Sequence, residues 1–313
     1  MNNIAMALAV QKAVKPRFRG HSNILPRMAM QYPTSLEREY VRLTNTYMAL
    51  LNSSLSEHLP TLRRAIDNAR AKMRYDDFDE FGYHGMDDLI VGVFARIRRD
   101  FQHRSQRYQL ERRILAVSTQ LRNFSVSQWR RLVRNTLGVN ILEDYYKGEF
   151  FRHSIGQWVN RNVNLITSVP QETLTELRTI IQSGWQQGTH NRVISKQIEA
   201  VYNVKKRKAE FWARDQVSKL NAEITQQQQK DAGVQEYVWS TSKDERVRGN
   251  PSGLWPEGKH YGFNGKRFSW AEPPEVAPGR NCHPGEDYRC RCVALPVFNL
   301  PNLSLPWERG ESE

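Results

Sequence analysis

The sequence lacks a long apolar run, and this absence excludes a membrane-spanning helix. No stretch of about 18 consecutive apolar residues occurs in its 313 residues. The apolar run from Ile4 to Val10 is followed, and not preceded, by the basic residues Lys12 and Lys15. A secretory signal carries its positive charge before the apolar segment, so we expect no export.

Cysteine is equally scarce, with three residues in the whole chain. Three thiols cannot build a disulfide framework for a protein of this length, and their number fits a reducing compartment. Nothing resembles a phosphate-binding P-loop, a nucleophile elbow or a carboxylate cluster for two metal ions. These absences argue against an ATPase, an esterase and a typical nuclease, and we expect a protein that is not an enzyme.

Positive charge is what the chain has in excess, with 46 Lys and Arg against 33 Asp and Glu and a formal net charge of +13. The excess comes from two segments. Residues 1–33 carry five basic residues and no acid, and residues 96–134 carry eleven arginines against two acids. Because arginine binds phosphate and carboxylate through two hydrogen bonds at once, these segments are expected to meet DNA phosphates or an acidic protein surface.

The candidate residues for this contact are all basic. They are Lys12, Lys15, Arg17, Arg19, Arg96, Arg98, Arg99, Arg104, Arg107, Arg112, Arg113, Arg130, Arg131 and Arg134. DNA binding through phosphates alone would be non-specific and steeply salt-dependent. The alternative is a solvated helix face that carries charge and binds nothing.

Apolar residues recur at helical spacing through most of the chain before residue 232. Residues 1–33 lack such a period and contain three prolines, so a basic flexible arm is expected there. Residues 34–165 are predicted to form an Arg-rich helical region, with breaks at Pro60 and at residues 123–126. An acidic loop is expected inside this region. Its acids are Asp76, Asp77, Asp79 and Glu80.

The helical pattern sharpens after Pro170. Three helices are expected over residues 171–187, 191–201 and 205–231, and Gly233 is the expected left-handed glycine that ends the last one. Short helices joined by glycine turns indicate a compact bundle.

The composition changes near residue 236, where Gly, Pro and Trp accumulate. Strands are predicted at 236–240, 267–270 and 292–298. A hairpin turn is predicted at Asn264-Gly265. We therefore expect a small β module over 236–300 and a loose tail over 301–313. The predicted fold class is α+β, a long, mainly helical N-terminal part followed by a small β-containing C-terminal module.

Residues that identify the protein lie in its C-terminal part. In chain order they are Arg214, Asp215, Trp239, Asp244, Glu245, Arg246, Arg248, His260, Gly265, Phe268, Trp270, Pro284 and Gly285, and the string ends in Cys290-Arg291-Cys292. In this order the elements closely resemble the phage Mu F-like minor head protein family, also called phage head morphogenesis proteins. The resemblance covers about residues 160–300 and predicts a Mu F-like domain over 166–300.

The resemblance implies a component of the virion of a tailed double-stranded DNA phage. Members of the family are minor head proteins at the portal vertex that act in head assembly and are implicated in genome packaging or delivery. The implied partners are the portal protein, scaffold or major capsid protein, and packaged DNA, with no membrane. The implied location is the head interior near the portal, after assembly in the host cytoplasm.

Five cysteine and histidine residues of the C-terminal part could supply ligands to a structural zinc ion. They are Cys282, Cys290, Cys292, His260 and His283. The single residue between Cys290 and Cys292 is fewer than the two to four found between the paired cysteines of zinc ribbons. Two alternatives remain, a tight turn with reduced, part-buried cysteines and a redox disulfide from Cys282.

A hydrolase or nuclease site is a further reading of the motif residues. Its members would be Asp244, Glu245, Arg246, Arg248 and His260. A histidine base with arginines beside a phosphate would suit cleavage of nucleic acid by a virion-carried nuclease or toxin-like enzyme. The alternative is a salt-bridged network that holds the β module together, with Asp244 capping a turn. A third function, a free nucleic-acid-binding protein of the host cell, also stays open.

Two further groups have a structural and a functional reading. The aromatic side chains Trp239, Trp255, Trp270, Tyr261 and Phe263 could stack on bases or form the core of the module. Arg214, Asp215 and Lys219 could dock the module through its Asp244-Glu245 pair, or could form ordinary ion pairs on a helix face.

Overall fold

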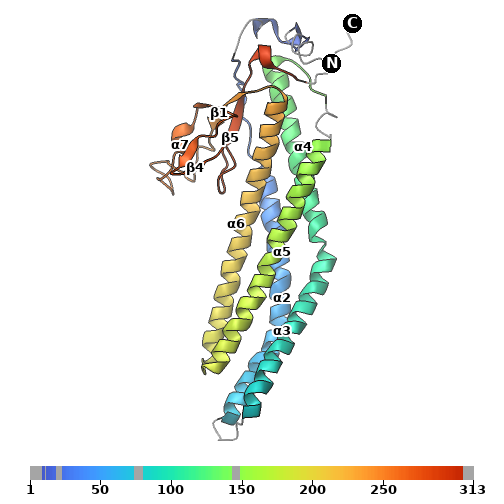
Figure 1. Cartoon of the computed structure of the whole chain (residues 1–313), viewed down its shortest axis with the longest axis vertical. Helices are drawn as coiled ribbons and strands as arrows, with labels where there is room; N and C mark the ends of the chain where they lie inside the picture. The colour runs from blue at the N-terminus through green and yellow to red at the C-terminus, as the bar shows by residue number, and fades with distance from the viewer. Residues whose placement is uncertain (1–8, 11, 19–22, 74–79, 143–148, 306–313) are drawn as a thin grey trace. The chain divides into compact units, whose positions relative to one another are not determined.

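The chain is mainly helical, with a small group of strands in its C-terminal third (Figure 1). The computed structural model describes residues 9–10, 12–18, 23–73, 80–142 and 149–305. The predicted α+β class is confirmed. Several predicted residues lie outside the described part of the chain. They are Arg19, Asp76, Asp77 and Asp79, together with the side chains of Arg17 and Glu80.

Five helices of 28 to 41 residues make up most of the described chain. They are α2 (Thr34–Met73), α3 (Glu80–Tyr108), α4 (Leu110–Leu137), α5 (Glu149–Gln186) and α6 (Asn191–Asp231). Shorter turns of helix accompany them, and three of these have bounds within the described residues. They are the 3-10 turns η1 (Pro16–Phe18) and η3 (Leu300–Asn302) and the four-residue helix α7 (His260–Phe263).

The long helices run through the points where the sequence predicted breaks. Pro60 lies inside α2 and Pro170 inside α5, and α4 continues through residues 123–126. The two helices predicted over 191–201 and 205–231 are one helix, α6. The prediction of short helices joined by turns was therefore wrong.

Packing explains why the helices continue. A proline inside a helix removes one backbone hydrogen bond, but most of the stability of a helix in a protein comes from burying its apolar face. Leu55 and Leu62 are buried on either side of Pro60. Leu121, Ser125 and Trp129 are likewise buried across the break predicted in α4. The buried apolar face of each helix therefore continues across the positions where the local sequence predicts that the helix ends.

The strands form two small antiparallel sheets. β1 (Glu236–Ser240) lies between β2 (Arg267–Ser269) and β5 (Val293–Val297), in the order β2-β1-β5. β3 (Glu275–Ala277) pairs with β4 (Arg280–Asn281). The three predicted strands are confirmed to within one residue at each end.

Two predicted turns have different outcomes. Gly233 has a φ of 76° and follows α6, as predicted, and a Cβ there would lie 2.0 Å from the Asn302 carbonyl oxygen. Asn264 and Gly265 do form a turn, in which the N–H of Lys266 donates to the Phe263 carbonyl at 2.8 Å. This turn follows α7 and leads into β2, so it does not join two strands as a hairpin would.

The chain divides into two compact units, each built from separate stretches of sequence. We call residues 1–38, 116–158 and 214–313 the β unit, and residues 39–115 and 159–213 the helical unit. The predicted boundaries at residues 33 and 165 do not match these units, since the helices α2, α4, α5 and α6 each contribute to both.

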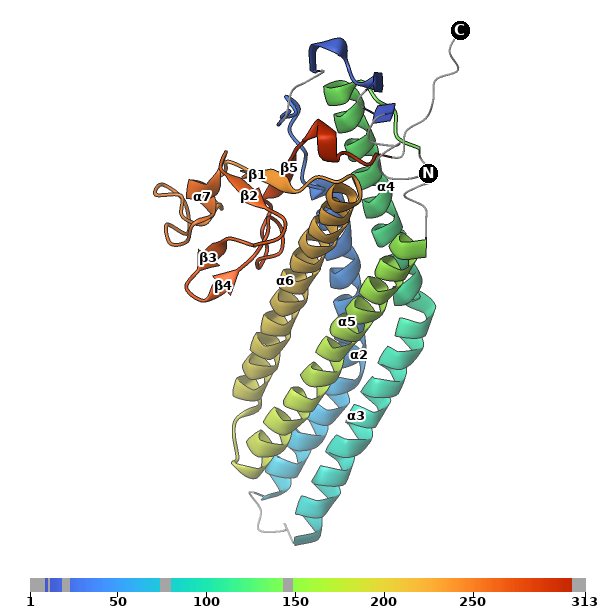
Figure 2. The same cartoon turned by 45° about the horizontal axis from the view of Figure 1, so that its top comes forward.

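The helical unit is built from parts of α2, α3, α5 and α6 that run alongside one another (Figure 2). Hydrogen bonds from tyrosine side chains join α2 to α5 and α6. The Tyr40 hydroxyl donates to Asn162 Oδ1 at 2.8 Å, and the Tyr202 hydroxyl donates to the Met48 carbonyl at 3.1 Å. A pocket of about 360 Å³ lies among α2, α5 and α6. It is lined mostly by apolar side chains, which include Leu55, Leu62, Ile66, Ile181 and Ile194.

The β unit includes chain segments that were expected to be loose. Ile24 and Phe298 exchange two backbone hydrogen bonds of 2.8 and 2.9 Å, so the N-terminal segment pairs with the residue that follows β5. Leu303 and Leu305 are fully buried. The described parts of the predicted arm and tail are therefore packed against the unit.

Trp129 on α4 is central to this packing. Its side chain is 0% exposed, and its ring centroid lies 5.9 Å from that of Phe298. We expect Trp129→Ala to lower the free energy of unfolding by about 3–5 kcal/mol, because it removes a buried aromatic ring and leaves a cavity. The measurement is urea denaturation followed by circular dichroism. The matched control is Trp255→Ala, because Trp255 is 46% exposed and should cost well under 1 kcal/mol. Equal losses in the two variants would contradict this account.

Candidate functional site

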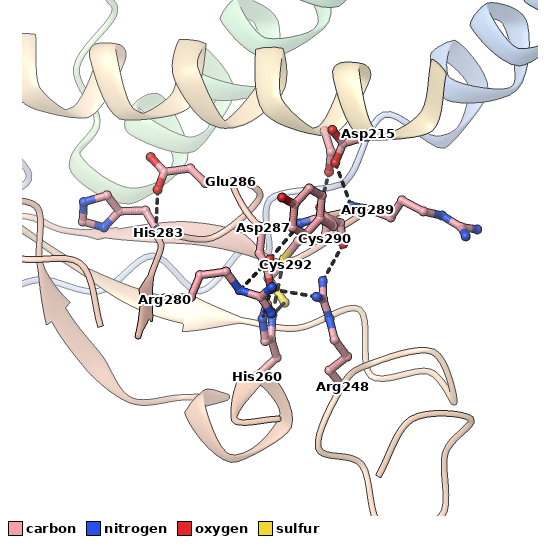
Figure 3. A network of polar contacts seen from close by, with 12 residues as sticks. Asp215, Arg248, His260, Arg280, His283, Glu286, Asp287, Arg289, Cys290 and Cys292 are labelled. Carbon is pink, nitrogen blue, oxygen red and sulfur yellow. Dashed lines mark hydrogen bonds and ion pairs between the residues drawn. The ribbon is translucent and has the colours of Figure 1, made fainter. Parts of the chain in front are cut away.

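The C-terminal half of α6 positions the segment that contains the Cys290-Arg291-Cys292 motif. Asp215 is buried on this helix, and its Oδ1 accepts the backbone N–H of Arg289 at 3.0 Å (Figure 3). Ser218 lies three residues further along the helix, and its hydroxyl donates to the Cys290 carbonyl. Lys219 forms an ion pair with Asp215 at 2.7 Å. The helix thus holds the backbone of residues 289–290 at two points.

The Pro284-Gly285 turn brings this segment close to α6. Gly285 has a φ of 88°, and a Cβ there would lie 2.8 Å from the Cβ of Ala222. A larger residue would therefore push the turn away from the helix. The turn is closed by Glu286, whose Oε2 accepts the backbone N–H of His283 at 2.6 Å.

Asp287 is the centre of the polar network in Figure 3. Its side chain is 1% exposed and forms ion pairs with Arg248 at 2.7 Å and with Arg280 at 3.2 Å. His260 Nε2 lies 3.0 Å from Asp287 Oδ2, and the Tyr288 N–H donates to Oδ1 at 2.9 Å. Burial alone would raise the pKa of Asp287, but the hydrogen bond from His260 and the charge of Arg248 hold it below its usual value.

The other nitrogen of His260 faces two thiols. His260 Nδ1 lies 3.5 Å from Cys290 Sγ and 3.7 Å from Cys292 Sγ. These three side chains form a group whose ligand atoms all lie within 4.8 Å of one another. All three are buried, with Cys290 3% and Cys292 5% exposed. The histidine therefore connects a buried carboxylate on one side with a pair of cysteines on the other.

The two thiols have opposite tendencies to ionise. The pKa of Cys290 is lowered, because the Cys292 thiol donates a hydrogen bond to its thiolate, and His260 acts in the same direction against the effect of burial. The pKa of Cys292 is raised by that same hydrogen bond and by burial. The pair thus favours a single shared negative charge beside the imidazole.

The chemistry open to this cluster is limited by its burial. A thiolate next to an imidazole that is oriented by a carboxylate resembles a nucleophilic site. A nucleophile must reach its substrate, and neither thiol faces solvent. Two thiols and an imidazole are also ligands of a soft or borderline metal ion, and such a site can lie in the interior of a domain.

Two of the five predicted metal ligands lie outside this cluster. His283 Nδ1 is instead within hydrogen-bond distance of the Tyr237 hydroxyl, at 2.9 Å, and its ring centroid lies 4.8 Å from that of Trp270. The third cysteine, Cys282, is half-buried and is not part of the group formed by His260, Cys290 and Cys292.

The residues of the predicted hydrolase site do not converge. Arg248 and His260 meet at Asp287, but Asp244 pairs with Arg291, and Glu245 is exposed. Asp244 Oδ1 also accepts the backbone N–H of Arg246 at 3.0 Å, so it caps a turn. These contacts correspond to the salt-bridged network that was the alternative reading.

The predicted docking of α6 has a different partner. Asp215 does contact the segment after β4, but through the backbone N–H of Arg289 and not through the Asp244-Glu245 pair. The Nε atom of Arg214 lies 3.9 Å from Oε1 of Glu37, with which it forms an ion pair.

Most of the candidate stacking aromatics form the core of the β unit. Trp239 and Trp270 are buried, and Phe263 and Phe268 pack edge-on against Trp239 at 5.3 and 5.9 Å between ring centroids. Trp255 and Tyr261 are exposed and differ from the rest. The core reading therefore holds for the buried members.

Sequence reasoning missed the residues that complete the network. Neither Asp287 nor Arg280 was among the predicted site residues. The one signal in the sequence is the position of Asp287 directly after the Pro-Gly-Glu turn, three residues before Cys290.

The basic residues predicted to bind DNA lie in both units. In the helical unit Arg96, Arg98, Arg99, Arg107, Arg112 and Arg113 are exposed, whereas Arg104 is ion-paired with Asp100 and Glu57. In the β unit Lys12, Arg131 and Arg134 are exposed, whereas Arg130 Nε donates to the Ile141 carbonyl and Lys15 Nζ to the Asn135 carbonyl. Among the described helices, none is long and apolar enough to cross a membrane.

His283 gives the β unit a pH-dependent stability. Burial, helped by the charge of Lys230, lowers the pKa of His283 to about 4, whereas an unfolded histidine titrates near 6.5. Between these values the unfolded chain binds the extra proton, so the free energy of unfolding falls as the pH is lowered from about 6.5 to about 4. The loss should approach 1.4 kcal/mol per pH unit at most.

His283→Gln tests this dependence, because it removes the titrating ring and leaves all other ionisable groups in place. We expect denaturation of the variant at a series of pH values to show a shallower slope than the wild type over this window. Parallel slopes in the two proteins would contradict a buried neutral His283.

Comparisons with known proteins agree with the motif residues. Residues 175–295 match the family model described as Phage Mu protein F like protein, and they span the end of α5, the whole of α6 and the strands from β1 into β5. An uncharacterized protein of Haemophilus influenzae is 30% identical over 167 residues, which are 53% of this chain. The match spans about a third, 34%, of that relative's length. No solved structure matches the chain.

The matched residues contain Asp215, the Asp287 network and the Cys290-Arg291-Cys292 sequence. The family match thus confirms the resemblance that the motifs predicted, and residues 175–295 are a phage Mu F-like segment.

Proposed function

We propose that this chain is a minor head protein of a tailed double-stranded DNA phage and acts in head morphogenesis. The observation that carries the proposal is the phage Mu F-like segment at residues 175–295. This segment includes the α6 surface and the buried polar network that fix the β unit, so the range of the family match spans the residues on which the local structure depends.

The proposed location is the interior of the head, near the portal. The portal protein is the proposed principal partner, with scaffold or major capsid protein and the packaged DNA as further partners. A role in genome packaging or delivery belongs to the same proposal. The role is structural and not enzymatic, in keeping with the buried thiols and with the separation of Asp244 and Glu245 from His260.

DNA contact is proposed for the exposed arginines of α3. Arg96 and Arg99 are three residues apart, so they share one face of the helix, whereas Val93, Ile97 and Phe101 are buried. Together with Arg98 they have no ion pair to an acid within the described ranges. Unpaired guanidinium groups on a solvent-facing surface are suited to DNA phosphates.

Purified particles provide the first test. We expect the chain to co-sediment with phage heads in a density gradient, to be absent from heads assembled without portal protein, and to resist protease until the heads are opened. The major capsid protein serves as the internal control, since its sedimentation does not depend on the portal. Recovery of the chain only in the soluble fraction would contradict the head location and favour a free nucleic-acid-binding protein.

Salt-dependent binding to duplex DNA tests the arginine surface. We expect the triple variant Arg96→Ala, Arg98→Ala and Arg99→Ala to bind more weakly, and the slope of log affinity against log salt to fall by up to about 3, because each lost phosphate contact removes about one unit. The measurement is fluorescence anisotropy at several salt concentrations.

The matched control removes the same charge elsewhere in the helical unit, as Arg192→Ala, Lys196→Ala and Arg207→Ala on α6. All three residues are exposed and lie outside the predicted contact. Equal losses in the two triple variants would show that net charge alone decides binding, and not the α3 surface.

A further inference from the structure

We infer that His260, Cys290 and Cys292 bind one zinc ion, and that Asp287 positions the histidine ligand. The inference does not depend on the proposed role in the phage head. It starts from three buried side chains whose donor atoms, Nδ1 and two Sγ, converge within 4.8 Å.

The distances within the cluster fit a tetrahedral metal ion. Zinc binds thiolate sulfur at about 2.3 Å and imidazole nitrogen at about 2.0–2.1 Å. A tetrahedral angle between two such bonds places the nitrogen and the sulfur about 3.6 Å apart. His260 Nδ1 lies 3.5 Å from Cys290 Sγ and 3.7 Å from Cys292 Sγ. The imidazole nitrogen therefore already stands at the separation from each sulfur that two ligands of a shared ion have, and all three donors lie within 4.8 Å of one another.

The surroundings of His260 supply the outer contact that metal-binding histidines require. A histidine that binds zinc through one nitrogen almost always donates its other N–H to a carboxylate, a carbonyl or water, which fixes the orientation of the ring. His260 Nε2 lies 3.0 Å from Asp287 Oδ2, and the carboxylate is held in turn by Arg248 and Arg280. The ring is thus oriented with Nδ1 toward the thiols.

The donor set selects the class of metal. Two thiolates and one imidazole are soft or borderline ligands, which suit zinc and are a poor match for magnesium or calcium. Three protein ligands leave one position of the tetrahedron for a fourth ligand. The Cys282 thiol does not belong to the group, so it is not assigned as that ligand.

The architecture of the β unit indicates what the ion would do. His260 begins α7, whereas Cys290 and Cys292 lie directly before β5. The strands here have two to five residues each, so they bury little apolar surface on their own. A metal ion would join α7 to the segment directly before β5. Its binding would contribute folding free energy that the short strands do not supply.

The experiment uses the full-length chain expressed with added zinc and purified under reducing conditions. We expect elemental mass spectrometry to find about one zinc ion per chain, and cobalt substitution to give an absorption band from thiolate-to-cobalt charge transfer. Chain without stoichiometric zinc, combined with no such band on cobalt addition, would overturn the inference. This arm needs no variant, so it holds even where a substitution prevents folding.

Variants test the ligand set, and the chain offers its own control. We expect Cys290→Ser, Cys292→Ser and His260→Asn each to lower the zinc content and to weaken or shift the cobalt band. Cys282→Ser removes the third cysteine and should retain about one zinc ion and the wild-type band. Loss of zinc from Cys282→Ser equal to that from Cys292→Ser would overturn the assignment of the ligands.

Asp287→Asn tests the positioning role. We expect zinc affinity, measured by competition with a chromophoric chelator, to fall about 10- to 100-fold, whereas the charge-transfer band at saturating cobalt is retained. Unchanged affinity in this variant would contradict a positioning role for Asp287. Loss of the band at saturating metal would contradict it as well, since a positioning residue is not a ligand.

Discussion

One buried carboxylate, that of Asp287, imposes the arrangement of the motif residues. A charge taken out of water is costly unless it is paired and hydrogen-bonded. Asp287 is paired with Arg248 from a loop, with Arg280 from β4 and with His260 from α7. Because each partner must reach the same point, three segments that share little regular structure are held together, and the cysteines beside His260 gain fixed positions.

The long helix α6 provides the platform for this cluster. Asp215, Ser218 and Gln229 each bond to the segment that they face, and Gln229 also accepts the indole N–H of Trp270 at 3.0 Å. These contacts follow the helix over four turns, so the register of the strands depends on α6 remaining one continuous element. The family match accordingly begins before the strands and includes this helix.

The sequence predicted the strands better than the helices, for a physical reason. β1 and β5 are short apolar runs bounded by turns, and such patterns are local. Pro60 and Pro170 are local signals too, but the buried stripe on either side of them outweighs the lost hydrogen bonds. The cluster of His260, Cys290 and Cys292 was predicted less well than the strands but better than the helix ends. Cysteine and histidine content drew attention to the right region, but only tertiary contacts reveal that His283 pairs with Tyr237 and that Asp287 selects His260.

The pairing of Ile24 with Phe298 has a consequence for the order in which the protein is made. The β unit is assembled from the described residues of three separate ranges, 1–38, 116–158 and 214–313. Such long-range pairing requires closure of a very large loop, which slows folding. On the ribosome, residue 24 must wait until residue 298 has been made before its partner exists. The β unit therefore cannot be completed until synthesis has passed residue 298, and a chain that ended before this residue would leave Ile24 without its pairing partner and open to chaperones and proteases.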